Sequence, residues 1–127
     1  MTLDSSAILA ILLREKESAE LLRLLQAAPT VRVGAPTLVE TTIVLDKRMG
    51  EDSLPLLERF LEAFQVLVVD FTASDWRLAV GAYRRYGKGN HPAGLNLGDC
   101  FSYATAAGVD ETLLYIGNDF SQTDRAR

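Results

Sequence analysis

The sequence predicts an α/β sandwich with a mainly parallel central sheet. Short apolar segments typical of strands alternate along the chain with longer segments that have helical periodicity. At 127 residues the chain fits a single domain, residues 1–127, that buries most of its surface on folding. In open parallel sheets the functional crevice lies beyond the carboxyl ends of the strands. Residues that follow strands are therefore the first candidates for a site.

The amino-terminal half predicts two strands, each followed by helices. MTL is a short strand, and Ser5 and Ser6 supply capping chemistry for the helix after it. Pro36 opens the helix after the second strand, and Gly50 ends that helix. The expected segments are strands at 1–3 and 31–35 and helices at 7–13, 15–28, 38–49 and 51–64.

The carboxyl-terminal half continues the alternation. VLVVDF, residues 66–71, is a continuous apolar run of the kind found in buried parallel strands. Residues 72–87 form the next predicted helix, and the turn-rich loop KGNHPAG follows it. Asn96 caps the helix expected at 97–109, and TLLYI, residues 112–116, is the last strand.

Composition and charge exclude several classes of protein. No apolar run reaches the ~18 residues of a transmembrane helix, so we expect no membrane partner. The amino terminus lacks the basic region of a signal peptide. The single cysteine, Cys100, cannot form an internal disulfide, which favours a reducing cytoplasm. With a net charge of −4, any nucleic-acid substrate must be held by a local basic patch.

Four acidic residues occur where an apolar segment meets a turn or the start of a helix: Asp4, Glu40, Asp99 and Asp119. Asp4 has an ordinary explanation as a helix cap, Asp99 as a first-turn acid and Asp119 as a turn residue. Glu40 has none, because its apolar neighbours predict a buried helix and no lysine or arginine lies one turn away. Since parallel strands end at a common edge, all four can approach one another.

A cluster of these acids would need a cation. Two carboxylates about 4 Å apart repel by roughly 4 kcal/mol at an effective dielectric constant near 20, and without a counter-charge they partly protonate. All-oxygen ligands favour Mg²⁺ or Mn²⁺, whereas one histidine and one cysteine do not make a zinc site. Metal ions held by carboxylates, with positions left for water and phosphate, hydrolyse phosphodiester bonds.

Basic side chains precede the last predicted helix. Four basic residues lie at the end of the helix predicted at 72–87 or between that helix and the Asn96 cap: Arg84, Arg85, Lys88 and His91. Two roles are open for them: cations suited to the carboxyl end of a helix, and contacts to RNA phosphates. We favour the phosphate contacts.

Four strings resemble the motifs of the PIN domain, and closely those of the VapC toxins of bacterial toxin–antitoxin pairs: DSSAILAIL, PTLVETTIVL, LNLGDCFSYATA and GNDFSQTD. The similarity runs from Met1 to about Asp124, and RYGKGNHPAGLNLGD is especially specific to the toxin group. It implies a PIN-domain-like α/β/α sandwich and an Mg²⁺- or Mn²⁺-dependent endoribonuclease. It also implies a VapB-type antitoxin as partner and a toxin homodimer.

The resemblance assigns the acids to a catalytic metal site. Three acids of the family quartet are matched without ambiguity: Asp4, Glu40 and Asp99. Asp119 is our choice for the fourth, although many family members carry that acid where this chain has Asn118, and Asp124 is a second candidate. The residues assigned to the support of the metal site are Ser6, Asn96, Asn118 and Asp124.

Two other functions stay open from the sequence. One is a PIN-fold nuclease that acts on DNA, but such proteins usually carry insertions for which 127 residues leave no room. The other is a non-catalytic nucleic-acid-binding module, against which the intact Asp4, Glu40 and Asp99 speak. A small antitoxin reading frame directly upstream of the gene would favour the toxin.

Overall fold

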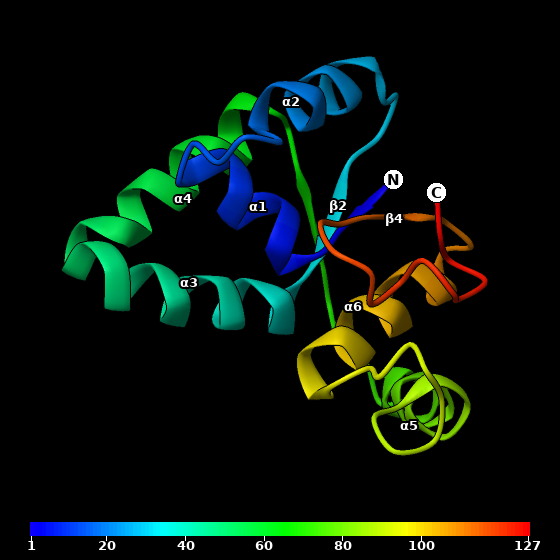
Figure 1. Cartoon of the computed structure of the whole chain (residues 1–127). Helices are drawn as coiled ribbons and strands as arrows, with labels where there is room; N and C mark the ends of the chain where they lie inside the picture. Colours follow the sequence, from blue (N-terminus) through cyan, green and yellow to red (C-terminus); the bar gives the residue numbers. More distant parts are fainter.

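The computed structural model describes residues 1–127 and contains a four-stranded parallel sheet between helices (Figure 1). The strand order is β3-β2-β1-β4, and none of the helices has the length and apolar character of a membrane span. The predicted α/β sandwich with a parallel sheet is confirmed. In chain order the elements are β1 (Thr2–Leu3), α1 (Ser5–Leu12), α2 (Ser18–Ala27), β2 (Arg32–Gly34), α3 (Ala35–Met49), the 3₁₀ turn η1 (Gly50–Asp52), α4 (Ser53–Ala63), β3 (Leu67–Val69), α5 (Asp75–Tyr86), α6 (Leu97–Gly108) and β4 (Leu113–Leu114).

The hydrophobic core has two halves, one on each face of the sheet. Leu114 belongs to one half and its neighbour Leu113 to the other, because successive residues of a strand point to opposite faces. Helices α1 to α4 fill the half that contains Leu114, and α5 and α6 fill the half that contains Leu113. The carboxyl ends of β1 and β2 lie at the lower edge of the sheet in Figure 1, where α1 and α3 begin.

Caps determine where two of the helices begin. Asn96 and Asp99 form a reciprocal capping box at the start of α6, so the predicted role of Asn96 as a cap is confirmed. The cap of α1 expected from Ser5 and Ser6 was wrong, and the alternative role of Asp4 as a helix cap is confirmed. Asp4 has the extended cap backbone and accepts a hydrogen bond from the Ser6 amide, whereas Ser5 is already helical.

Strand β3 differs from the prediction for residues 66–71. The apolar run predicts a buried strand, but Leu67 and Val68 are 52% and 49% exposed. The reason is topological, because β3 lies at the edge of the sheet and pairs only with β2. Helix α6 lies over β1, β2 and β4.

Helix α3 is also less buried than its sequence predicts. Thr37, Thr41 and Leu45 face the interior, while Val39 and Ile43 on the other side are 61% and 51% exposed. The apolar residues near Glu40 are therefore partly a surface feature. They do not all belong to the core.

Candidate active site

Asp4 is buried and firmly held at the end of β1. Its Oδ2 accepts hydrogen bonds from the Ser6 amide at 3.0 Å and from the Ser6 hydroxyl at 2.6 Å. Its Oδ1 accepts a third from the Ser102 hydroxyl at 2.6 Å. None of these donors carries a charge. Asp4 therefore has a fixed orientation but no counter-ion.

Asp99 reaches the same region from the first turn of α6. Its Oδ2 accepts a hydrogen bond from the Asn96 amide at 3.0 Å, and its own amide donates to Asn96 Oδ1 at 2.9 Å. The capping box uses only one carboxylate oxygen. The other accepts no hydrogen bond from the protein and is available to a ligand.

Burial and neighbouring charges disfavour the ionised form of Asp99. Burial is the largest cause that raises the pKa of Asp99 to about 7. The negative charges of Asp4, Asp119 and Glu40 act in the same direction, and the hydrogen bond from Asn96 opposes them. None of these four acids forms an ion pair with a basic side chain. The structure therefore gathers negative charge without neutralising it.

The side chain of Glu40 lies beside α6 at Gly98. A Cβ on Gly98 would clash with Glu40 Oε2, so the absence of a side chain lets the Glu40 carboxylate lie against the first turn of α6. This turn carries Asp99, whose pKa responds to the Glu40 charge. The contact explains why glycine precedes Asp99.

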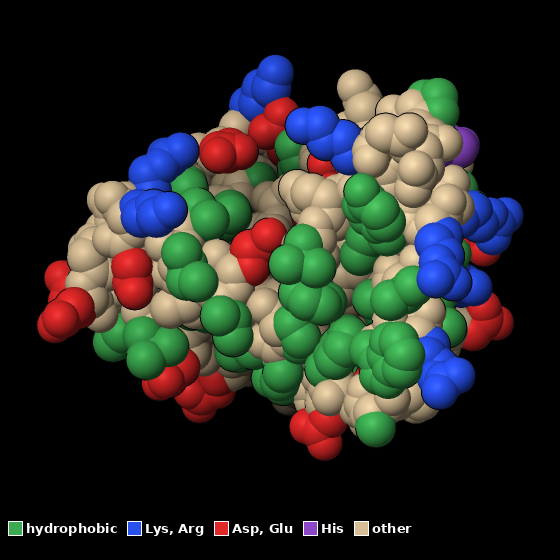
Figure 2. All heavy atoms as spheres, turned by 90° about the horizontal axis from the view of Figure 1, so that it is seen from below, with side chains coloured by type: hydrophobic (Ala, Val, Ile, Leu, Met, Phe, Trp, Pro, Cys, Tyr) green, Lys and Arg blue, Asp and Glu red, His purple; other side chains and the backbone are tan.

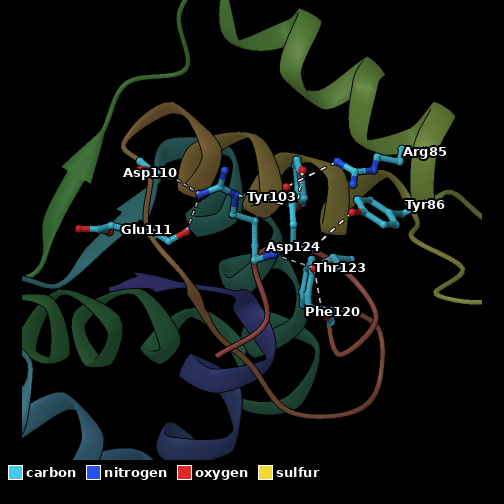
Figure 3. A network of polar contacts seen from close by, with 9 residues as sticks. Arg85, Tyr86, Tyr103, Asp110, Glu111, Phe120, Thr123 and Asp124 are labelled. Carbon is cyan, nitrogen blue, oxygen red and sulfur yellow. Dashed lines mark hydrogen bonds and ion pairs between the residues drawn. The ribbon is translucent and has the colours of Figure 1, made fainter.

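Asp119 and Asp124 lie in different surroundings. Asp119 is exposed on the segment after β4, and its charge acts on Asp99. Asp124 instead accepts a hydrogen bond from the Tyr103 hydroxyl at 2.7 Å and forms an ion pair with Arg85 at 3.5 Å (Figure 3). The structure brings Asp119 toward the other three acids and engages Asp124 elsewhere.

Two supporting residues act on the loop after β4. The Ile116 amide donates to the Ser6 hydroxyl at 3.0 Å, so Ser6 joins Asp4 to the chain just before this loop. The carbonyl of Asn118 accepts hydrogen bonds from the Ser121 hydroxyl and amide, which close a turn. Ser6 therefore touches an acid of the cluster directly, while the contacts of Asn118 are within the loop.

The acid cluster fits a hydrated cation better than a fully protein-ligated one. Nowhere in the chain do three His, Cys, Asp or Glu side chains lie close enough together to enclose a metal ion. The buried Asp4 and Asp99, both without a counter-ion, could serve as direct ligands, with water completing the coordination. Mg²⁺ commonly binds in this way, through one or two carboxylates and several waters.

The four basic candidates do not form one free patch. Arg85 pairs with Asp124 and lies over the Tyr86 ring, 4.8 Å from its centroid. His91 accepts a hydrogen bond from the Ala93 amide and contacts Tyr86 edge-on. Both side chains thus have contacts within the protein. Arg84 and Lys88 form no ion pair, and both are exposed.

Two hydroxyls near Asp4 are absent from the sequence-based site. Ser102 donates to Asp4, and its hydroxyl also lies 3.2 Å from that of Thr37. The available signal was helical spacing, since Ser102 follows Asp99 by three residues and Thr37 precedes Glu40 by three. Side chains at this spacing share a helix face, so both hydroxyls point toward the acids.

An apolar face surrounds Glu40. A hollow of about 400 Å³ is lined by Glu40 together with Val39, Ile43 and Leu97, all three of which are at least half exposed. Figure 2 shows hydrophobic side chains gathered across this side of the molecule around an acidic one. Exposed apolar patches of this kind mark interaction sites.

Comparison with known proteins identifies similar sequences and structures over nearly the whole chain. The family model described as "PIN domain" matches residues 1–126. A curated relative from Mycolicibacterium smegmatis, "Ribonuclease VapC", is 44% identical over 127 residues, which cover 99% of this chain and 98% of the relative.

Solved structures share the fold at low sequence identity. The Mycobacterium tuberculosis VapC20 structure, described as a "Sarcin-Ricin loop cleaving toxin", superimposes with a TM-score of 0.79 at 20% identity, over 98% of this chain and 95% of that one. VapBC2 from Rickettsia felis, bound to a DNA fragment from its promoter, gives a TM-score of 0.76 at 16% identity, over 98% and 93%.

Proposed function

This chain belongs to the PIN domain family, with VapC ribonucleases as relatives, and we propose that it is a toxin endoribonuclease that hydrolyses RNA with Mg²⁺ or Mn²⁺. The observation that carries the proposal is the approach of two buried carboxylates, Asp4 and Asp99, with no cationic partner. Burying such a pair is costly unless a cation or a ligand compensates. We place the reaction at Asp4, Glu40, Asp99 and Asp119.

Each acid has a distinct role in the proposed site. Asp4 and Asp99 would ligate the ion directly, and Glu40 and Asp119 would ligate it through water or hold a second ion when RNA is bound. A bound divalent ion lowers the pKa of water and stabilises negative charge on the phosphate. Ser6 and Ser102 orient Asp4, and Asn96 orients Asp99.

The products expected from in-line attack by water are a 5′-phosphate and a 3′-hydroxyl. This chemistry does not use the 2′-hydroxyl of RNA, so a preference for RNA must come from contacts outside the acids. Arg84 and Lys88 are suited to such contacts because both are exposed and neither forms an ion pair. Arg85 could join them by exchanging its partner Asp124, whereas the ring of His91 has a structural contact.

An antitoxin is the partner that best fits the apolar face around Glu40. An antitoxin segment with apolar side chains would cover Val39, Ile43 and Leu97. An arginine from the same segment would complement the unpaired acids. The resemblance of the fold to VapBC2, a toxin–antitoxin pair, supports this assignment, and we expect the toxin to form a homodimer.

Cleavage assays test the proposed reaction. Purified protein is incubated with single-stranded RNA, and with DNA of the same sequence, in Mg²⁺, Mn²⁺ or EDTA. We expect cleavage of RNA alone, only with a metal, and its loss in Asp4→Asn and Asp99→Asn. Asp52→Asn is the matched control, since Asp52 is exposed and has no ion-pair partner. Full activity of Asp99→Asn with metal supplied would sink the proposal.

A further inference from the structure

A second concave site lies between α5 and α6. Its volume is about 390 Å³, within the range of ligand-binding pockets. Three of its lining residues are arginines, Arg77 and Arg85 from α5 and Arg125 from the carboxyl-terminal segment, and none of its lining residues is acidic. In a chain with a net charge of −4, this is a local concentration of positive charge.

The three guanidinium groups differ in how firmly they are held. Arg125 pairs with Asp110 at 2.8 Å and is mostly buried. The Arg85–Asp124 pair is longer, at 3.5 Å, and its side chains are 63% and 42% exposed, so it contributes little to stability and can be exchanged. Arg77 has no acidic partner and lies over the Trp76 ring, 5.0 Å from its centroid. The pocket therefore offers one guanidinium without an ion pair and one whose ion pair can be exchanged.

Gly81 forms part of the pocket between the two arginines of α5. It lies four residues from each of them, and so on the same face of the helix. Glycine destabilises the middle of a helix relative to alanine. Apart from its chain neighbours and the backbone of its own helix, no atom lies within 4 Å of where its Cβ would be, so packing does not require a glycine here. The open position instead keeps the pocket accessible from outside.

One wall of the pocket lies on the helix that carries Asp99. Tyr103 lines the pocket and follows Asp99 by one helical turn on the same face of α6. The end of α5 adjoins the start of α6, because the Leu95 amide donates to the Tyr86 carbonyl at 3.0 Å. Arg85 is therefore at the end nearer the acids. Arg77 is eight residues, about 12 Å, farther along α5.

We propose that this pocket binds a phosphodiester group of the RNA strand beyond the bond that is cut. The inference rests on the proposed ribonuclease function. Guanidinium groups bind phosphate through paired hydrogen bonds, and the apolar Leu78 and Ala82 offer a surface to the adjoining nucleoside. Arg77 and Arg85 are thus substrate-binding residues that hold the strand in line with the acids.

RNA binding over a salt series tests the pocket. The probe is a fluorescent single-stranded oligoribonucleotide, and EDTA is present so that no cleavage occurs. We expect Arg77→Ala to weaken binding several-fold and to lower the slope of log affinity against log salt by about 0.7, the value for one lost phosphate contact on a single strand. Arg59→Ala, an exposed arginine of α4 without an ion pair, is the matched control and should leave both unchanged.

Substitution at Gly81 separates binding from stability. Gly81→Ala should raise the melting temperature, because the helix gains a better helix former. Gly81→Leu should fill the pocket and weaken RNA binding without a loss of melting temperature. Wild-type affinity and salt slope in both Arg77→Ala and Gly81→Leu would overturn the proposal. The proposal would also be overturned if these variants changed oligomeric state in sedimentation while their RNA affinity stayed unchanged. That result would make the pocket a protein interface.

The proposal for the pocket and the proposal for the nuclease can be contradicted separately. If the wild-type chain cleaves no RNA with any metal, but Arg77→Ala still weakens binding, the nuclease is wrong and the pocket stands. If the wild-type chain cleaves RNA and Arg77→Ala binds like wild type, the nuclease stands and the pocket is wrong.

Discussion

The acidic residues near the carboxyl ends of the strands form no ion pairs, whereas Asp110, Glu111 and Asp124 do. Glu111 pairs with Arg32 and accepts a hydrogen bond from the Thr2 hydroxyl, and Asp110 pairs with Arg125. Figure 3 shows the arrangement around Asp110, Glu111 and Asp124. Asp4, Glu40, Asp99 and Asp119 form no ion pair, although two of them are buried.

The difference separates structural from functional carboxylates. A paired acid ties segments together: Glu111 joins the loop before β4 to β1 and β2. An unpaired buried acid weakens the fold unless a ligand compensates. A buried acid without an ion pair is therefore a candidate ligand-binding group.

The largest expected effect is on the pH dependence of stability. The pKa of Asp99 in the folded state is about 7, above its unfolded value, so this group destabilises the fold as pH rises from about 4 through 7. At about 1.4 kcal/mol per pKa unit, the loss amounts to a few kcal/mol. Urea unfolding in EDTA should show Asp99→Asn gaining stability over wild type across this window, and Mg²⁺ should stabilise only the wild type. Parallel curves for the two proteins would contradict the prediction.

Glu111→Gln should lower the stability of the fold, whereas Asp99→Asn should raise it. It removes the charge that pairs with Arg32, and a hydrogen bond to a charged group contributes about 1.5–3 kcal/mol. We expect a lower free energy of unfolding by that amount at neutral pH, with RNA cleavage per folded molecule unchanged. Glu58→Gln, an exposed acid of α4 without an ion pair, is the control. If Glu111→Gln were as stable as Glu58→Gln, Glu111 would not be a structural carboxylate.

Asp119 and Asp124 are the two candidates for the fourth acid of the metal site, and substitutions of them should have different effects. Asp119→Asn should lower activity about 10–100-fold, the range for residues that act on a metal through water, and weaken Mn²⁺ binding. Asp124→Asn should instead reduce stability by about 1 kcal/mol, because it removes the negative charge that strengthens the hydrogen bond from the Tyr103 hydroxyl. Calorimetric titration of Mn²⁺ and thermal unfolding measure both effects. A larger loss of Mn²⁺ affinity in Asp124→Asn would assign the fourth position to Asp124.

The smallest effect is expected at Gly98. Gly98→Ala places a Cβ where Glu40 Oε2 lies, and the end of that flexible side chain can move away. Activity should therefore fall several-fold while stability holds or rises slightly, because alanine favours the helix. Gly108→Ala, where a Cβ meets only ordinary contacts, is the control. An unaffected rate in Gly98→Ala would show that the position of Glu40 does not matter.

Much of the fold and part of the site can be predicted from the sequence. Alternating periodicity gives the order of strands and helices, and the Asn96 cap places Asp99. The pattern of apolar residues does not show whether another element of the fold covers a strand or a helix face. For that reason β3 and the outer side of α3 were expected to be buried, although they are exposed. The partners of Asp124, Tyr103 and Arg85, come from segments distant in sequence, and no local pattern encodes them.

The hydrogen bonds of Asp4 have a consequence for the order of assembly during synthesis. Ser102, which donates to Asp4, comes 98 residues later in the chain. The Ile116 amide, which fixes Ser6, comes 110 residues after Ser6. Strand β4 also pairs with β1 in parallel. The chain therefore lacks the groups that orient Asp4 until α6 and β4 have been made, so the acid site can be ordered only late in synthesis.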